Sequence, residues 1–214
     1  MKPLTPFAIR KLIVLLCFFC LLGCKNHQGI QTGDLIFVDD TSSDLTKAIN
    51  DVTKKSGHAN YTHVGVCEVL DGVVYIYHAS TQKNVVKEPF DSFKADRKNS
   101  TLDVFRIQGL NTDRKENAIR KAKKFLGMPY DYGYIYGDSA IYCSELVYEM
   151  FKTDSIFKLN PMTFKNPKTG EFHPNWVSHY EKLGIPIPEG EPGCNPNDMS
   201  RNKRLKFIST LEIN

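Results

Sequence analysis

The chain has 214 residues, 41% of them hydrophobic, with 28 basic and 24 acidic side chains and a formal net charge of +4. Three of the bases and none of the acids lie in the first 23 residues, so residues 24–214 carry 25 bases against 24 acids. This near balance gives no basis for predicting a nucleic-acid partner. The length suits one domain with a substantial core.

The N-terminal 23 residues have the composition of a secretory signal. A positively charged flank precedes an apolar run, 12–22, that is shorter than the about 20 residues needed to span a bilayer. The run ends in Leu21-Leu22-Gly23-Cys24, which resembles a bacterial lipobox, where the cysteine is diacylated and becomes residue one after cleavage. We expect a signal peptide over 1–23 and an exported lipoprotein that Cys24 anchors to a membrane, on its periplasmic or other extracytoplasmic face. The alternative is an ordinary signal peptide or membrane anchor that contains a cysteine.

Residues 24–32 form a polar tether in this interpretation, and 33–214 form one domain. Ser43 can cap one helix, and Asp113 with Glu116 resembles a capping box for another. The patterning favours an α+β fold, an antiparallel sheet with helices packed on it. The expected strands are 35–38, 63–70, 73–79, 85–86 and 102–107, with 204–208 as a last run that returns to the sheet. The expected helices are 44–55, one after 113 that stops at 127, one containing Cys143, and 176–183.

Cys143 lies where a loop rich in Gly, Tyr and Asp turns into a helix. A thiol in the first turn of a helix is exposed to the positive end of the helix dipole, which stabilises the nucleophilic thiolate. The alternative is a core cysteine, since Cys is among the most buried residue types. Cys67, Cys143 and Cys194 make an odd count after processing, which suggests a free thiol, with a Cys67–Cys194 bridge left open. No Cys-x-x-Cys or His-Glu-x-x-His spacing indicates a metal.

Asp71-Gly72 between two apolar runs predicts a two-residue hairpin turn. With that turn, the numbers of opposed residues sum to 143, so Gly65 faces His78. His63 and His78 then become diagonal neighbours on one face, about 7–8 Å apart at the backbone. Side chains at this separation can touch.

A thiol nucleophile needs a base that a third polar group orients. We therefore predict that His63 takes the proton from Cys143 and that His78 orients His63. Ser80 and Glu68 are rival third residues, although Glu68 points to the opposite face. The alternative for His63 is a strand histidine whose polar atoms are satisfied by backbone.

Several blocks carry a family resemblance: 60–66 (Asn-Tyr-Thr-His-Val-Gly-Val), 127–131 (Gly-Met-Pro-Tyr-Asp), 142–146 (Tyr-Cys-Ser-Glu-Leu) and the tail at 187–198. They resemble the circularly permuted papain-like peptidases and amidases of the NlpC/P60 superfamily, in the YiiX/YebB-like branch, over 33–205. The resemblance implies a papain-like core in which the histidine strand precedes the cysteine helix, with Cys143 as nucleophile and His63 as base. A polar residue on the next strand, often Glu, completes the triad, and here His78 takes that position. A histidine there is also found in the lecithin-retinol-acyltransferase-like group, which moves acyl chains between lipids.

The oxyanion hole would combine the Cys143 N–H with a second donor. Tyr130 is the candidate for that donor, and the alternative is that it is a packing aromatic of its loop. Whether the tail from Asn160 caps the cleft or packs on the back is open in the sequence.

The leading hypothesis is a lipid-anchored cysteine hydrolase that cleaves an amide in cell-wall peptides or small peptide-like amides. Neither a metal nor an organic cofactor is implied. A lipid acyltransferase or thioesterase with the same Cys–His pair is one alternative, and a non-catalytic binding lipoprotein is another. A groove lined by apolar side chains would favour an acyl substrate, whereas charged groups placed for an amine or carboxylate would favour a peptide.

Overall fold

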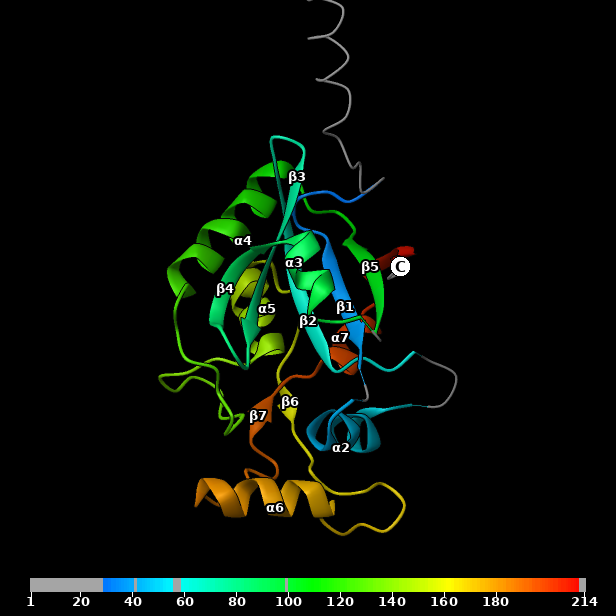
Figure 1. Ribbon diagram of the computed structural model, residues 1–214, viewed down its shortest axis with the longest axis vertical. Helices are drawn as coiled ribbons and strands as arrows, with labels where there is room; N and C mark the ends of the chain where they lie inside the picture. Colours follow the sequence, from blue (N-terminus) through cyan, green and yellow to red (C-terminus); the bar gives the residue numbers. More distant parts are fainter. Residues whose placement is uncertain (1–28, 41, 56–58, 99, 212–214) are drawn as a thin grey trace, which may run out of the picture.

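The computed structural model describes residues 29–40, 42–55, 59–98 and 100–211 (Figure 1). Its centre is a six-stranded antiparallel sheet in the order β4-β3-β2-β1-β5-β8. The strands are β1 (Leu35–Asp39), β2 (His63–Leu70), β3 (Val73–Ser80), β4 (Asn84–Pro89), β5 (Thr101–Ile107) and β8 (Leu205–Leu211).

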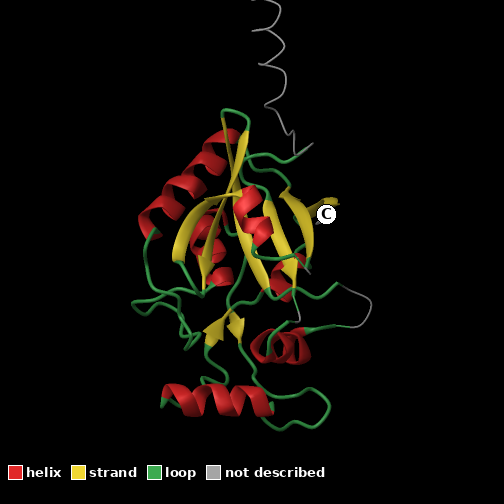
Figure 2. Ribbon diagram, in the orientation of Figure 1, coloured by secondary structure: helices red, strands yellow, loops and turns green. Residues whose placement is uncertain are grey.

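Helices lie on both faces of this sheet and beyond one end of it (Figure 2). A two-stranded ribbon, β6 (Asn160–Pro161) with β7 (Pro192–Gly193), leads to that end. The predicted α+β fold with an antiparallel sheet is therefore confirmed. The helices are α2 (Asp44–Thr53), α3 (Phe90–Ala95), α4 (Thr112–Phe125), α5 (Cys143–Phe151), α6 (Pro174–Leu183) and α7 (Pro196–Ser200), with a 3-10 turn at Lys152–Asp154.

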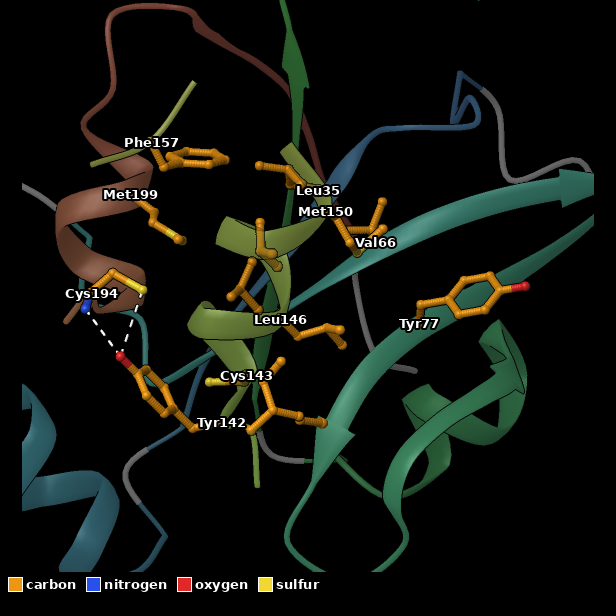
Figure 3. Packing of buried hydrophobic residues seen from close by; sticks show 14 of the residues in the cluster. Leu35, Val66, Tyr77, Tyr142, Cys143, Leu146, Met150, Phe157, Cys194 and Met199 are labelled. Carbon is orange, nitrogen blue, oxygen red and sulfur yellow. Dashed lines mark hydrogen bonds between the residues drawn. The ribbon is translucent and has the colours of Figure 1, made fainter. Parts of the chain in front are cut away.

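Alternation along the strands divides the core between the two faces of the sheet. Leu35 and Phe37 of β1 pack with α4 and α5, while Ile36 and Val38 pack with α3. Figure 3 shows α5 lying against this first face. The helix that begins at Cys143 is therefore held on one face, and α3 covers the other.

The hairpin register agrees with the sequence prediction. Val66 pairs with Tyr77 and Leu70 with Val73, so opposed residue numbers sum to 143. A Cβ on Gly65 would lie 3.3 Å from the Cβ of His78 and 2.7 Å from a methyl group of Ile76. A side chain at position 65 would therefore crowd the space beside His78.

Several elements differ from the sequence expectation. The prediction of a capping box at Asp113 and Glu116 is wrong, because α4 begins at Thr112 and its N-cap is Asn111. The Asn111 side chain accepts a hydrogen bond from the Arg114 N–H at 3.0 Å. Asn is as good an N-cap as Asp, and it comes first in the chain. The helix at Ser43 is capped as expected. Strand β4 is longer than 85–86, and β8 does join the sheet edge, whereas α3, α7 and the β6–β7 ribbon were not expected.

The packed domain includes residues just before position 33. Ile30 is buried against the α3 face, and Thr32 accepts a hydrogen bond from the Val69 N–H. Residues 1–28, with the predicted signal peptide and Cys24, lie outside the described part of the chain. Within the described part, no helix is both long and apolar enough to cross a membrane.

The tail from Asn160 folds over the end of the sheet at which α5 begins (Figure 1). Helix α6 lies beside α2, and the Asn175 side chain donates to the Asp44 carbonyl at 3.1 Å. The Asn197 side chain accepts from the Tyr61 N–H at 2.6 Å and donates to Thr53 at 2.7 Å. The tail is thereby fixed against the segment that leads into β2, and it caps the cleft rather than packing on the back of the domain.

Candidate active site

Cys143 is the first residue of α5, and its side chain is only 5% exposed. Burial raises the pKa of the thiol to about 11, although hydrogen bonds from the backbone of Val64 and Ser144 oppose the shift. The expectation of a stabilised thiolate is therefore not met in the resting structure. The reason is that burial destabilises the charged thiolate by more free energy than the helix N-terminus and the backbone donors stabilise it.

A hydrogen-bonded series of three side chains runs across strands β2, β3 and β4. His63 Nε2 lies 3.0 Å from His78 Nδ1, and His78 Nε2 lies 2.8 Å from Glu88 Oε1. The two imidazole rings are nearly perpendicular, with centroids 5.0 Å apart. The predicted diagonal pair of histidines is therefore in contact.

The carboxylate at one end of this series sets the tautomer of both rings. Glu88 accepts a hydrogen bond from His78 Nε2–H, so the lone pair of neutral His78 is on Nδ1. That nitrogen accepts from His63 Nε2–H, which leaves the lone pair of His63 on Nδ1. These tautomers follow from the hydrogen-bond pattern. His63 Nδ1 is thus the nitrogen that can act as a base.

Glu88 is held as a carboxylate. Its second oxygen binds Lys83 Nζ at 2.7 Å, and Lys83 also binds Asp96 at 2.6 Å. The hydrogen bond from His78, together with Lys83, lowers the pKa of Glu88 to about 2 despite partial burial. Its charge is therefore available to fix His78 throughout the neutral range.

Sequence reasoning missed Glu88, although a signal for it was present. Val86 pairs with His78 and Glu88 with Ile76, so Glu88 is the diagonal neighbour of His78 on the same face. Finding it required extending the strand beyond 85–86. The rival third residues lie elsewhere: Ser80 accepts from the N–H groups of Gln82 and Lys83 in the turn. Glu68 binds the hydroxyl of Tyr77 together with Lys87 and Lys123.

Arg97 and Phe93 form a wall beneath the two histidines. The Arg97 guanidinium lies 3.7 Å from the Phe93 ring centroid and donates to the Phe93 carbonyl at 2.7 Å. The Phe93 ring contacts His78 edge to face, with centroids 5.0 Å apart. Burial, assisted by the Arg97 charge, lowers the pKa of His63 well below its usual value and also lowers the pKa of His78, against the opposing effect of Glu88. Both rings are therefore neutral at rest.

Cys143 and His63 reach the same end of the sheet from opposite faces. The thiol accepts from the backbone of Val64, the residue after His63, and this contact helps to lower its pKa against burial. Burial lowers the pKa of Arg97, and the Cys143 thiolate is one of the charges that raise it. The same guanidinium therefore acts on the thiol and on both imidazoles, which places the three within one electrostatic site.

Two tyrosine hydroxyls also belong to this site. Tyr130 and Tyr134 are buried, line the cavity beside Cys143, and have hydroxyl oxygens 3.4 Å apart. Burial raises the pKa of Tyr130 well above its usual value, and the nearby Cys143 contributes. Tyr130 thus lines the same cavity as the predicted nucleophile, and Tyr134 is a second hydroxyl there that the sequence did not single out.

The loop before Cys143 is tied to buried carboxylates. Glu145 accepts from the Gly137 N–H at 3.0 Å, and Asp131 accepts from the N–H groups of Gly133 and Ile135 at 2.6 Å each. Burial raises the pKa of Glu145 to about 7, and the two carboxylates repel each other. Both residues fix the backbone that carries the tyrosines to the nucleophile.

A cavity of about 230 Å³ opens beside Cys143. Figure 3 shows Cys143, Tyr142 and Cys194 close together, and the Cys194 N–H donates to the Tyr142 hydroxyl at 3.2 Å. Cys67, Cys143 and Cys194 are all free thiols, so the bridge left open by the sequence is not formed. The walls of the cavity come from α2, from the loop at 130–142 that precedes α5 (the tyrosine loop) and from the tail. They include Ile49, Val52, Tyr134, Met162, Phe164 and Trp176.

Comparisons with known proteins give the family and the fold of this chain. A family profile described as "Permuted papain-like amidase enzyme, YaeF/YiiX, C92 family" matches residues 29–209. The uncharacterised protein YiiX of Escherichia coli strain K12 is 31% identical over 123 residues, which span 57% of this chain and 57% of that protein. A crystal structure described as metalloprotein yiiX from Escherichia coli O157:H7 matches with a TM-score of 0.72 and 24% identity, over 86% of this chain and 99% of that one.

The pKa directions at the site predict how Cys143 reacts with iodoacetamide. Because the thiol pKa is raised from 9.0 to about 11, the thiolate fraction at pH 7 is about a hundredfold below that of an unperturbed cysteine. Alkylation of Cys143 should be slow at pH 7 and should rise steadily up to pH 11. The measurement is the alkylation rate against pH, followed by peptide mass spectrometry.

His63→Ala is the matched control for this profile, since it removes the imidazole and leaves the helix terminus in place. A rate that levels off below pH 8 in the native protein, and only there, would contradict a neutral resting pair. It would show instead a thiolate–imidazolium pair.

Proposed function

The chain belongs to the permuted papain-like amidase family of cysteine hydrolases, and we propose on that premise that it hydrolyses a small amide through an acyl-enzyme on Cys143, with His63 as general base. The observation that carries this proposal is the series from Glu88 through His78 to His63. It leaves the basic lone pair of His63 on Nδ1, and His63 stands at the end of the sheet where the thiol lies. Family membership concerns the reaction class, and the assignment of each residue is our proposal.

In the first half of the reaction, His63 Nδ1 takes the thiol proton as Cys143 Sγ attacks the carbonyl carbon. Proton transfer during the attack suits a neutral resting pair, since the thiol need not be ionised beforehand. The developing oxyanion is stabilised by the Cys143 N–H and by the hydroxyl of Tyr130. His63 then gives its proton to the departing amine, the C–N bond breaks, and the acyl group remains on sulfur as a thioester.

In the second half, His63 removes a proton from water, whose oxygen adds to the thioester carbonyl. The C–S bond breaks, the sulfur recovers the proton, and a carboxylic acid leaves. His78 positions His63 and disperses the imidazolium charge toward Glu88 in both halves. Glu88 and Lys83 act through His78 and are positioning residues.

The solved relative described as a metalloprotein raises the question of a metal ion at this site. The donor atoms here do not fit one: both ring nitrogens of His78 are already bonded, to His63 and to Glu88. Within the described ranges, no three or more His, Cys, Asp and Glu side chains form a group that could hold a metal. The proposed steps use only this chain's residues and water.

Two alternatives remain beside this proposal. Cell-wall peptides are the substrates that the resemblance implies, but the apolar walls of the cavity favour a substrate with an apolar acyl group. The same Cys–His pair could pass such a group to a lipid alcohol instead of water, as an acyltransferase, or act as a thioesterase. A binding lipoprotein without catalysis would have no need for the fixed tautomer of His63.

Paired substitutions of His78 test the proposed function. His78→Asn keeps an acceptor for His63 Nε2–H, whereas His78→Leu removes it. Hydrolysis of an activated p-nitrophenyl acyl ester should fall roughly a hundredfold or more in His78→Leu, within the range that general base catalysis contributes, and much less in His78→Asn.

The control for this pair is Ser80→Ala, in which a turn residue outside the series is changed and kcat should be unaffected. Equal losses in both His78 variants would show that His78 does not work by accepting from His63. Activity unchanged in His78→Leu would remove His78 from the mechanism.

We further propose that the mature protein is held at a membrane by lipid on Cys24. The support is the sequence at 12–24, together with a family match that begins close behind it, at residue 29. Cells fed radiolabelled palmitate should label the native protein and not Cys24→Ser, and the variant should appear in the soluble fraction. Labelling of Cys24→Ser, or its full retention in membranes, would contradict this proposal.

A further inference from the structure

The cavity beside Cys143 is closed by parts of the chain outside the hydrogen-bonded series. Its walls come from α2, from the tyrosine loop and from the tail. Met162 lies so close to Gly193 that a Cβ on this glycine would overlap the Met162 sulfur. The segments that carry β6 and β7, both of which line the cavity, therefore pack tightly against each other.

Charge is confined to the mouth of this cavity. Among the described residues that line it, Lys55 and Asp198 alone are charged, and both are exposed. Asp198 is already bound by Asn195 and Arg201. An ammonium or carboxylate placed deeper would lose water without gaining a partner, which is costly. The interior accordingly suits an uncharged group.

The thiol lines the cavity, and this decides which half of the substrate enters. Cys143 is one of the lining residues, whereas His63 is not. His63 must protonate the departing amine, which therefore lies on its side. The acyl group stays on sulfur, and the cavity is the space open to it.

The size of the cavity limits that acyl group. A volume of about 230 Å³ is below the roughly 300–1,000 Å³ of sites for drug-sized ligands. Aromatic rings surround it: Phe164 and Trp176 meet edge to face with centroids 5.1 Å apart, and Tyr134 contacts Trp176 at 5.4 Å. These walls fit a short acyl chain or a single ring.

We propose that this cavity binds the acyl part of the substrate, and that the substrate is an amide of a short, uncharged, apolar carboxylic acid. The assignment rests on the proposed function, because it places the acyl carbonyl on Cys143. It separates this substrate class from amides whose acyl part carries a free charge, such as the acidic and basic residues of peptides.

The test compares amides that share one aminocoumarin leaving group and differ in the acyl part: acetyl, hexanoyl, adipoyl and palmitoyl. Hexanoyl should exceed acetyl by tenfold or more in kcat/KM, since about four further methylene groups leave water. Adipoyl, which matches hexanoyl in length but ends in a carboxylate, should fall to the acetyl level or below. Palmitoyl should also fall below hexanoyl, because the cavity is too small for it.

A cavity-filling variant keeps the result tied to this site. Val52→Phe on α2 should lower the ratio of hexanoyl to acetyl turnover at least fivefold, whereas Val73→Phe, at the exposed hairpin end, should leave the ratio unchanged. Turnover of adipoyl equal to that of hexanoyl, or a ratio unaffected by Val52→Phe, would overturn the assignment and leave the amidase function standing. Hydrolysis of none of the amides would overturn the proposed function, and this assignment with it.

Discussion

The site depends on one directional set of hydrogen bonds, which begins at a carboxylate and ends at a lone pair. Glu88 fixes the proton of His78, and His78 fixes the proton of His63. The three residues come from three adjacent strands, so the set exists only in the observed register of β2, β3 and β4. A slip of one residue in either pairing would move a member to the other face of the sheet. The fold therefore serves the site mainly by holding this register.

Burial acts on the two reacting groups in opposite directions and yields a neutral pair. It raises the pKa of the Cys143 thiol to about 11 and lowers the pKa of His63. The tail causes part of this burial, because Cys194 and its neighbours cover the start of α5. The same enclosure that suppresses the free thiolate provides an apolar space for an acyl group. Reactivity then requires a substrate carbonyl beside the thiol, which protects the cysteine when no substrate is bound.

The sequence predicted the parts of this site that local patterns determine. Asp71-Gly72 fixed the hairpin and hence the contact between His63 and His78, and the helical spacing after Cys143 located α5. Glu88 is missed because the turn before β4, Thr81-Gln82-Lys83, contains no glycine or proline, and the sequence pattern predicts a strand of only two residues there. The pKa of the thiol could not be predicted, since it depends on tail residues about 50 positions away.

The most direct measurement is mass spectrometry of the protein after rapid acid quenching during turnover of an acyl-aminocoumarin amide. The account predicts one added acyl group, mapped by peptide analysis to Cys143, with neither adduct nor turnover in Cys143→Ala. Turnover that persists in Cys143→Ala, or an acyl group found on Cys194 or another residue instead, would contradict it.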